Sequence, residues 1–395
     1  MNGARAKPLS RRDHVYSILS GLVEEPTVNP PGQRYIEIQN KIRKELENVG
    51  ARARISQFAR GKPNLVASFG HGHPNLLLSS HIDVVASGSA WRRDPFKATE
   101  HDGKIFGRGA ADAKGSVAAM IAAMAYVADR VQEMKGSVTF ASTVDEETGG
   151  IMGLGALVNK KRVVPDFAVI GEPTDLNAAF CEKGVYWCEI AIEGKAAHAA
   201  TPHLGINAIE EMSNVVLRLQ QFRPRQEHTY LGRPTRNVGL IAGGTAINTV
   251  ADRCTISLDR RLLPGETTRD ARNEIKKELL ASSASFPGLK YQIHDILAAE
   301  PFEQRPEEEF IQLVLKATQE VTGTEPRLKG MSGFTDARHL LPGKKSTAVI
   351  LGPGSISQAH VANEYVPRKQ LEDAAKVYSR IVENVLICGR QSWFD

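Results

Sequence analysis

The chain has 395 residues, of which 42% are hydrophobic and 24% are charged, and its formal net charge is +5. This composition is typical of a globular protein with a sizeable core and excludes disordered and fibrous chains. Basic and acidic residues are mixed without a run of five or more like charges, so we expect no nucleic-acid partner. The length predicts two domains.

The first 25 residues are basic but reach Asp13, Glu24 and Glu25 before any long apolar stretch, so they do not predict a signal peptide. Nowhere do about 18 apolar residues follow one another, so we expect no membrane partner. The cysteines form no close C-x-x-C pair and are expected to be buried and reduced, in a cytoplasmic protein. They are Cys181, Cys188, Cys254 and Cys388.

The stretch 75–85, NLLLSSHIDVV, is a continuous apolar run of the kind found in parallel strands buried on both faces. His81 and Asp83 are two residues apart, so they face the same side of a strand. The Asp83 carboxylate is then able to hold the second imidazole nitrogen of a ligating His81. A structural histidine satisfied inside the core is the alternative.

A glycine-rich loop, FGRGAADAKG, precedes a helix predicted over 114–134 and carries Asp112. Gly107 and Gly109 suggest a dinucleotide fingerprint, and with it a nucleotide-dependent oxidoreductase. The third glycine of that motif would fall on Asp112, however, which puts an acid where a pyrophosphate should lie. The alternative role for Asp112 is a helix N-cap.

A strand predicted over 137–144 leads into three consecutive acids followed by two glycines. The acids are Asp145, Glu146 and Glu147. Their mutual repulsion requires a cation or ample water, and the apolar strand before them favours a buried cation. An exposed acidic turn is the alternative.

Residues 184–296 follow the order strand, helix, strand, strand, helix, strand, which is that of a ferredoxin-like unit. The apolar strand 346–352 and the helix 370–387 then resume the first pattern. The sequence therefore predicts an α/β fold in which a domain with a mostly parallel central sheet is interrupted by an inserted α+β ferredoxin-like domain. The predicted boundaries are 1–179 with 296–395 for the first domain and 180–295 for the second.

Two further candidate ligands follow apolar strands: Glu172 after 166–170, and His360 after 346–352. Open α/β sheets place their sites at the carboxyl ends of strands. A hydrolase with two metals needs imidazole and carboxylate ligands, a carboxylate to bridge the ions and a free carboxylate as base. This chain offers all of them.

Spaced motifs along nearly the whole chain resemble the M20 metallopeptidase family, in particular its acetylornithine deacetylase and succinyl-diaminopimelate desuccinylase branch. The motifs are SSHIDVV, WRRDPF, GRGAADAKG, DEETGG, GEPT, GKAAHAATPHLGINAI, DRRLLPGE, SGFTDARHL and LGPGSISQAHVANEYV. The resemblance implies that the first domain is catalytic and binds zinc, and that the inserted domain is a lid and dimerisation domain.

The same resemblance implies two zinc ions per subunit. His81 and Glu172 would bind one ion, Glu147 and His360 would bind the other, and Asp112 would bridge both. Cobalt or manganese suits these ligands as well.

Catalytic roles are also implied. Glu146 would be the general base for a metal-activated water, and Asp83 would orient His81. His198 of the inserted domain would reach the site of the partner subunit and stabilise the oxyanion, which implies a homodimer. An exposed loop histidine is the alternative for His198.

For substrate binding, the resemblance implies Arg261 beside the substrate carboxylate and Asn248 in the same lid region. Arg260 is adjacent and would point to the opposite face of a strand.

The resulting expectation is hydrolysis of the amide bond of an N-acyl amino acid, with N-acetylornithine as the leading candidate. Alternatives within the family are N-succinyl-diaminopimelate desuccinylase, dipeptidase, carboxypeptidase and aminoacylase. A catalytically silent protein that binds metal and ligand is the alternative outside enzymes.

Overall fold

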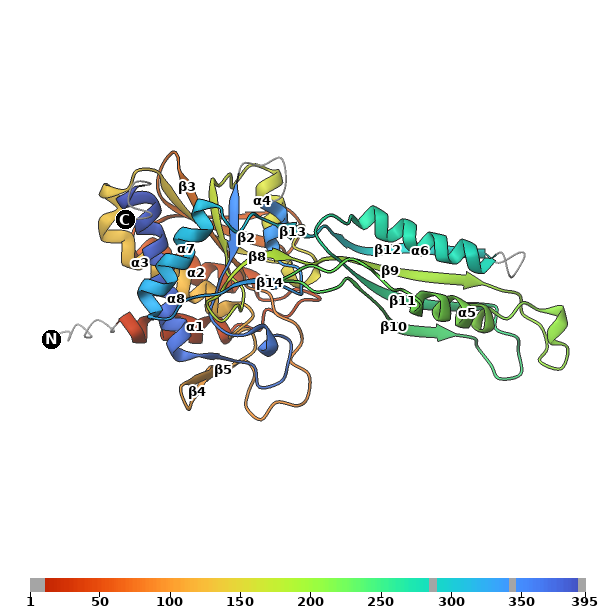
Figure 1. Ribbon diagram of the computed structural model, residues 1–395. Helices are drawn as coiled ribbons and strands as arrows, with labels where there is room; N and C mark the ends of the chain where they lie inside the picture. The colour runs from red at the N-terminus through yellow and green to blue at the C-terminus, as the bar shows by residue number, and fades with distance from the viewer. Residues whose placement is uncertain (1–10, 284–289, 341–345, 390–395) are drawn as a thin grey trace. The chain divides into compact units, whose positions relative to one another are not determined.

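The computed structural model describes residues 11–283, 290–340 and 346–389 (Figure 1). The chain forms two compact units. The first comprises Met1–Phe180, Gln304–Lys329 and Thr335–Asp395, and the second comprises Cys181–Glu303 and Gly330–Phe334. The second unit thus extends past residue 295 to Glu303 and takes in a short segment near residue 330.

A central sheet organises the first unit. Its strands are β1 (Arg52–Gln57), β2 (Pro63–Gly70), β3 (Asn75–His81), β6 (Ser137–Thr143), β7 (Phe167–Ile170), β8 (Ala178–Glu182) and β15 (Thr347–Ile350). Their order is β1-β2-β6-β3-β7-β15-β8. The central strands β6, β3, β7 and β15 are parallel, and the flanking pairs are antiparallel. The predicted α/β class with a mostly parallel central sheet is confirmed.

The apolar runs seen in the sequence form the middle of this sheet. Every residue of β6 is buried, as are all residues of β3 after Asn75. Strands in this position have both faces covered, which explains why their sequences are continuously apolar instead of alternating.

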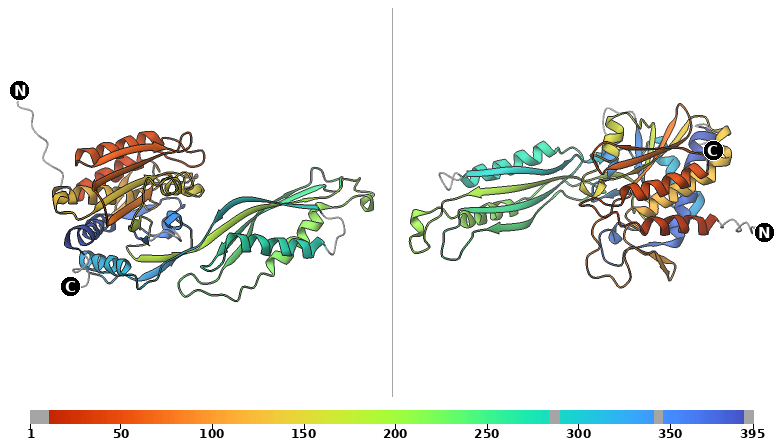
Figure 2. Two further views of the ribbon diagram at one scale, coloured as in Figure 1. Left: turned by 90° about the horizontal axis from the view of Figure 1, so that it is seen from above. Right: turned by 180° about the vertical axis from the view of Figure 1, so that it is seen from behind.

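Helices cover the sheet. They are α1 (Arg11–Val23), α2 (Tyr35–Asn48), α3 (Lys114–Val127), α4 (Leu154–Asn159), α7 (Glu309–Thr322) and α8 (Arg368–Glu383). α2 packs on β1 and β2, α3 on β3 and β6, and α7 on β15, while α8 packs against α3 (Figure 2). α3 is buried on nearly all sides because its residues are small or apolar. Its predicted continuation to residue 134 is a 3₁₀ turn, Ala128–Glu133.

A small separate sheet lies beside the glycine-rich loop. Its strands are β4 (Thr99–His101), β5 (Lys104–Phe106) and β16 (Tyr365–Pro367), in the order β16-β5-β4. The pairing of Tyr365 with Phe106 brings the segment after His360 next to the segment that leads to Asp112.

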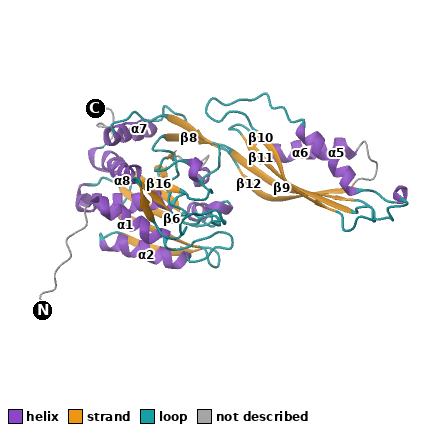
Figure 3. Cartoon of the chain, turned by 90° about the horizontal axis from the view of Figure 1, so that it is seen from below, coloured by secondary structure: helices purple, strands orange, loops and turns teal. Residues whose placement is uncertain are grey.

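The second unit contains β9 (Gly184–Glu193), α5 (Ala208–Gln220), β10 (Thr235–Gly243), β11 (Arg253–Leu262), α6 (Thr268–Ser283) and β12 (Lys290–Ala299). The strands are antiparallel in the order β10-β11-β9-β12, which is the predicted ferredoxin-like arrangement. α5 and α6 pack on this sheet (Figure 3) around an apolar cluster that includes Ile190, Met212 and Ile275. Two short strands, β13 (Phe302–Glu303) and β14 (Leu328–Met331), both pair with β8 and so belong to the nine-stranded central sheet.

Three cysteines are buried as predicted, but Cys388 is exposed, so the prediction is wrong for this residue. Cys388 ends the helical segment that follows α8, where the chain leaves the core. None of the helices among the described residues is both long and apolar enough to cross a membrane. The first 25 residues were not expected to form a signal peptide, and residues 1–10 of this stretch lie outside the described residues.

Candidate metal centre and active site

Five segments of the first unit bring candidate ligands to the carboxyl edge of the sheet. His81 is the last residue of β3, and Glu147 and Glu172 follow β6 and β7. Asp112 precedes α3, and His360 lies in the segment between β15 and β16. Because β3, β6, β7 and β15 are parallel, their carboxyl ends meet at one edge, where such sheets place their sites.

The side chains form two groups that share Asp112. In the first group, His81 Nε2 lies 3.2 Å from Asp112 Oδ1 and 3.7 Å from Glu172 Oε1. In the second, His360 Nε2 lies 3.3 Å from Asp112 Oδ2 and 2.9 Å from Glu147 Oε2. Within each group the ligand atoms all lie within 4.8 Å of one another. Asp112 therefore offers one oxygen to each group.

Buried charge dominates the electrostatics of these groups. Burial raises the pKa of Glu172 to about 7 and also raises the pKa of Glu147. Hydrogen bonds with Asp112 and Glu147 raise the pKa of His360 to about 10. Burial alone would raise the pKa of Asp112, but the hydrogen bonds from His360 and His81 outweigh it and lower that pKa. So many buried acids are stable only with positive charge among them.

A divalent cation fits both groups. Glu147 Oε1 and Glu172 Oε1 are buried and have no hydrogen-bond partner among the described residues, and one of these two carboxylates belongs to each group. Such unpartnered buried oxygens are costly unless a ligand binds them. Imidazole nitrogens with carboxylate oxygens suit zinc, cobalt and manganese.

Glu146 lies beside the two groups without belonging to either. It is 7% exposed and begins a 3₁₀ turn, Glu146–Thr148. Burial raises the pKa of Glu146 well above its ordinary value, and Glu172 and Glu147 add to this effect. A carboxylate with a raised pKa accepts a proton more readily, as a general base must.

The turn that carries Glu146 ends in glycines for a steric reason. Gly150 has φ +60°, and a Cβ at this position would collide with the carboxylate of Asp336. Asp336 itself is buried and accepts a hydrogen bond from Thr143 Oγ1 at 3.1 Å. A larger residue at position 150 would displace either the acidic turn or Asp336.

Asp83 links His81 to the acidic turn. His81 Nδ1 lies 3.0 Å from the Asp83 carbonyl oxygen and 3.6 Å from Asp83 Oδ1. The Asp83 carboxylate accepts hydrogen bonds from the backbone N–H groups of Glu146 and Glu147, at 3.3 and 3.1 Å. Asn29 Nδ2 donates a further hydrogen bond at 2.9 Å. The carboxylate thus holds the turn in place as well as facing the imidazole.

Three of the local alternatives raised by the sequence fail for structural reasons. The N-cap of α3 is Ala113, with no side-chain cap, so Asp112 is not an N-cap. The side chain of Glu147 is only 5% exposed, so the acids do not form an exposed turn. The glycine-rich loop cannot hold a pyrophosphate as a dinucleotide fingerprint does, because the backbone N–H groups of Gly109 and Ala111 already donate to a carboxylate, that of Glu364.

In the second unit, His198 and Asn248 lie together. Both are exposed, and Ala199 donates its backbone N–H to the Asn248 carbonyl oxygen at 3.0 Å. His198 also pairs with Thr249 in an isolated β-bridge. These segments follow the last residue of β9 and precede the first residue of β11.

Arg261 lies at the other end of the same sheet. It pairs with Val185, near the start of β9, so the length of that strand separates it from His198. Its guanidinium binds Asp259 through two hydrogen bonds of 2.8 and 3.0 Å. Arg260 is buried on the opposite face and binds Glu266 and Glu274. Within this unit Arg261 and His198 are not brought together.

Residues that sequence reasoning missed include Asn29, Asp336 and Glu364, all buried close to the ligands. None of them has a local sequence signal, because each lies far along the chain from its partner. Only the presence of Asp336 in SGFTDARHL and of Glu364 in VANEYV, inside stretches already singled out, pointed toward them.

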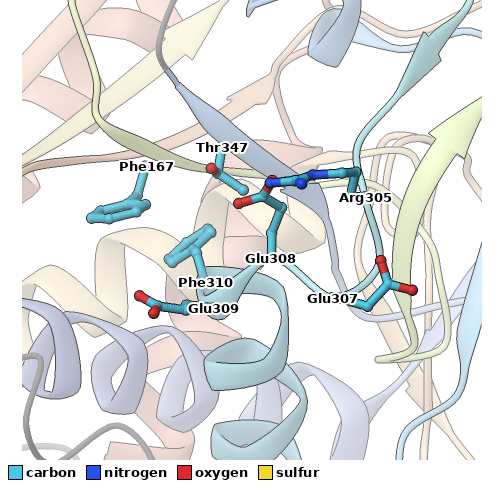
Figure 4. Close-up of a pocket in the computed structure, with 7 residues that line it drawn as sticks. All are labelled: Phe167, Arg305, Glu307, Glu308, Glu309, Phe310 and Thr347. Atoms are coloured by element: carbon cyan, nitrogen blue, oxygen red, sulfur yellow. The ribbon is translucent and has the colours of Figure 1, made fainter.

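A cavity of about 390 Å³ lies elsewhere in the first unit (Figure 4). It is lined by Phe167, Arg305, Glu307, Glu308, Glu309, Phe310 and Thr347. Phe167 and Thr347 are the first residues of β7 and β15, so this cavity is at the amino ends of strands whose carboxyl ends carry the site. It is therefore separate from the candidate metal centre.

Comparisons with known proteins identify the family of the chain and show similar folds. A model of peptidase family M20/M25/M40 matches residues 77–384. An acetylornithine deacetylase of Klebsiella pneumoniae (strain 342) is 34% identical over 336 residues, covering 82% of this chain and 84% of that protein. An M20 family metallo-carboxypeptidase of Sulfolobus solfataricus has a similar fold, with a TM-score of 0.79 at 20% identity over 94% of this chain and 98% of that one. A dinuclear metal-binding M20 peptidase of Bacillus subtilis superimposes with a TM-score of 0.72 at 16% identity, over 94% and 97% of the two chains.

Proposed function

The chain belongs to peptidase family M20/M25/M40, and from this premise we propose that it removes the acyl group from the α-nitrogen of an N-acyl amino acid. The chain is a hydrolase that acts on amide bonds, as its family is. N-acetylornithine is the leading candidate substrate, since the Klebsiella relative with that activity in its name matches over most of both chains.

The observation that carries this proposal is the shared carboxylate of Asp112, with His81 at 3.2 Å from one oxygen and His360 at 3.3 Å from the other. We assign His81 and Glu172 to one metal ion, Glu147 and His360 to a second, and Asp112 to both. Zinc is the metal we propose, and cobalt or manganese would suit the same ligands.

When bound, a metal pair of this kind polarises the amide carbonyl and lowers the pKa of water. Glu146 accepts the proton of the attacking water and later delivers it to the leaving amine. Its burial and raised pKa suit this task, because the base must hold a proton between the two steps. Asp83 keeps Glu146 in position through the backbone N–H of that residue.

We further propose that the enzyme is a homodimer in which His198 donates a hydrogen bond to the oxyanion in the partner's site. Support comes from the second unit alone. His198 is exposed and follows the last residue of β9. The chain enters the unit near the first residue of this ten-residue strand, and the strand is about 33 Å long. Two further residues would bind the substrate: Asn248, which lies beside His198, and Arg261, which would bind the substrate carboxylate.

A panel of substrates tests the reaction. Release of free amine should be measured with N-acetylornithine, N-succinyl-diaminopimelate, other N-acyl amino acids and several dipeptides, first as purified, then after chelation, and then after zinc is restored. We expect deacylation that disappears with chelator and returns with zinc. Preference for the succinyl substrate or for dipeptides would replace the deacetylase assignment by one of those family activities. Bound metal without turnover of any substrate would favour a catalytically silent binding protein.

A further inference from the structure

A second buried carboxylate, Glu364, organises the loop that carries Asp112. Glu364 is fully buried and lies four residues after His360, just before β16. Its Oε1 accepts hydrogen bonds from the backbone N–H groups of Ala111 at 2.8 Å and Asp112 at 3.0 Å. Its Oε2 accepts from the Gly109 N–H at 3.0 Å.

A cation balances this carboxylate. Arg108 Nη1 donates to Glu364 Oε2 at 2.7 Å, and Arg108 is itself 1% exposed. A buried ion pair is favourable only when further hydrogen bonds satisfy its remaining lone pairs. The three backbone N–H groups meet this condition, so the loop 108–112 is wrapped around one carboxylate.

Glu364 joins two chain segments that both carry candidate ligands. Its own segment includes His360, and the loop that it holds includes Asp112. These two ligands face each other at 3.3 Å in the second group. His360 has φ +63°, a left-handed conformation that side-chain-bearing residues adopt only where their surroundings impose it. The His360 side chain is half exposed, and its contacts with other segments include Asp112 at 3.3 Å and Glu147 at 2.9 Å, so its position depends on where the loop that carries Asp112 is held.

We propose that Glu364 is a positioning residue that sets the distance between Asp112 and His360, and thereby the affinity of the second metal group. This inference rests on the proposed metal-dependent function. Glu364 belongs to neither candidate ligand group; it acts through the backbone N–H of Asp112 and through the chain that leads back to His360. Both groups contain Asp112, but only the second also contains His360, which lies on the same segment as Glu364, so the affinity of the second group should change more than that of the first.

The test is zinc binding to metal-free full-length protein, followed by calorimetry, for the native chain and for Glu364→Gln. The glutamine keeps the shape but places an amide N–H₂ against backbone donors. We expect two zinc ions in the native chain, and about 10- to 100-fold weaker binding of one of them in Glu364→Gln, as for other groups that orient metal ligands. Asp373→Asn is the matched control. Asp373 is a buried carboxylate on α8 whose partners are Lys369 and Lys376, so this variant should bind both ions normally.

Amide hydrogen exchange supplies a readout that needs no metal. In metal-free protein, the N–H groups of Gly109, Ala111 and Asp112 should be protected in the native chain and in Asp373→Asn. In Glu364→Gln they should exchange at least about tenfold faster, because they lose a charged hydrogen-bond acceptor. If Glu364→Gln does not fold, Glu364→Asp, which keeps the charge but withdraws it by one methylene, is expected to show the same two changes.

Unchanged affinity for both ions in a folded Glu364 variant would overturn the inference while leaving the metal-dependent function intact. Unchanged exchange at residues 109–112 would overturn it as well. A native chain that binds no zinc, cobalt or manganese would instead overturn the proposed function, and the metal-affinity role of Glu364 with it.

Discussion

The candidate residues of the first unit and those of the second differ in how deeply they are buried within a single chain. His81, Asp112 and Glu172 are each at most 8% exposed, and their ligand atoms already lie within 4.8 Å of one another. His198 and Asn248 are exposed, and Arg261 lies at the other end of their sheet.

The physical reason for this contrast is the charge that each set carries. Buried carboxylates repel one another and must be held by their own fold at defined distances for a cation to bind. Substrate-binding groups need no such enclosure, because the ligand or a second subunit can complete their surroundings. We infer that metal binding is a property of the first unit alone, whereas catalysis also requires the second.

The largest effect is expected for Asp112→Ala. Because each of its oxygens faces a different histidine, removing this carboxylate should abolish both activity and the binding of two metal ions. Metal content by elemental analysis and amine release check this prediction. Two ions retained per chain would show that Asp112 is not shared.

Glu146→Gln should separate the base from the ligands within the same turn. Metal content should stay near normal, while kcat should fall by about 10²- to 10⁴-fold, the usual contribution of a general base. Glu133→Gln, a change at an exposed glutamate paired with Arg130, is the control and should have normal activity. Full activity in Glu146→Gln would remove the assignment.

His198→Ala tests whether the second unit acts on another subunit. Metal content should be unchanged, and kcat should fall on the order of 10²- to 10³-fold, as for loss of one oxyanion donor. His203→Ala, at an exposed histidine nearby, serves as the control.

Mixing subunits makes the same prediction sharper. If the histidine comes from the partner, a mixed dimer of one His198→Ala subunit and one Glu146→Gln subunit contains one intact site. Random exchange between equal amounts of the two variants then restores about one quarter of all sites. No recovery after verified subunit exchange would place His198 in the site of its own chain or outside any site.

The smallest effect is expected for Arg261→Met. Loss of a charge-assisted contact with the substrate carboxylate costs about 1.5–3 kcal/mol, which should appear mainly as a higher KM. Arg261→Lys should recover part of this loss because it keeps the charge but not the two-pronged geometry. Equal KM values for native chain and Arg261→Met would exclude Arg261 from substrate binding and direct attention to other cations of the second unit.

Much of the fold could be predicted from local patterns in the sequence. The continuous apolar runs around Leu77 and Phe140 predicted buried parallel strands, and the order of elements from Gly184 onward predicted a ferredoxin-like unit. Cys388 was predicted wrongly because burial at the end of a helix depends on what packs there, which residue type alone does not show.

The sequence predicted the candidate ligands of the site better than the residues that support those ligands. His81, Glu147 and Glu172 follow strands that the sequence reveals, so their convergence could be expected from the parallel sheet. Asn29 and Glu364 could not be expected, because they contact Asp83 and Asp112 across 54 and 252 residues of chain.

The sequence by itself therefore determined the α/β class, the inserted unit and the types of ligand available, since these depend on local periodicity and on the chemistry of single side chains. Only the tertiary structure decided that Asp112 faces two histidines and that Glu364 holds its loop. It also decided that Arg261 and His198 stand at opposite ends of one sheet. Distances of this kind depend on how distant segments pack, and no local pattern records that packing.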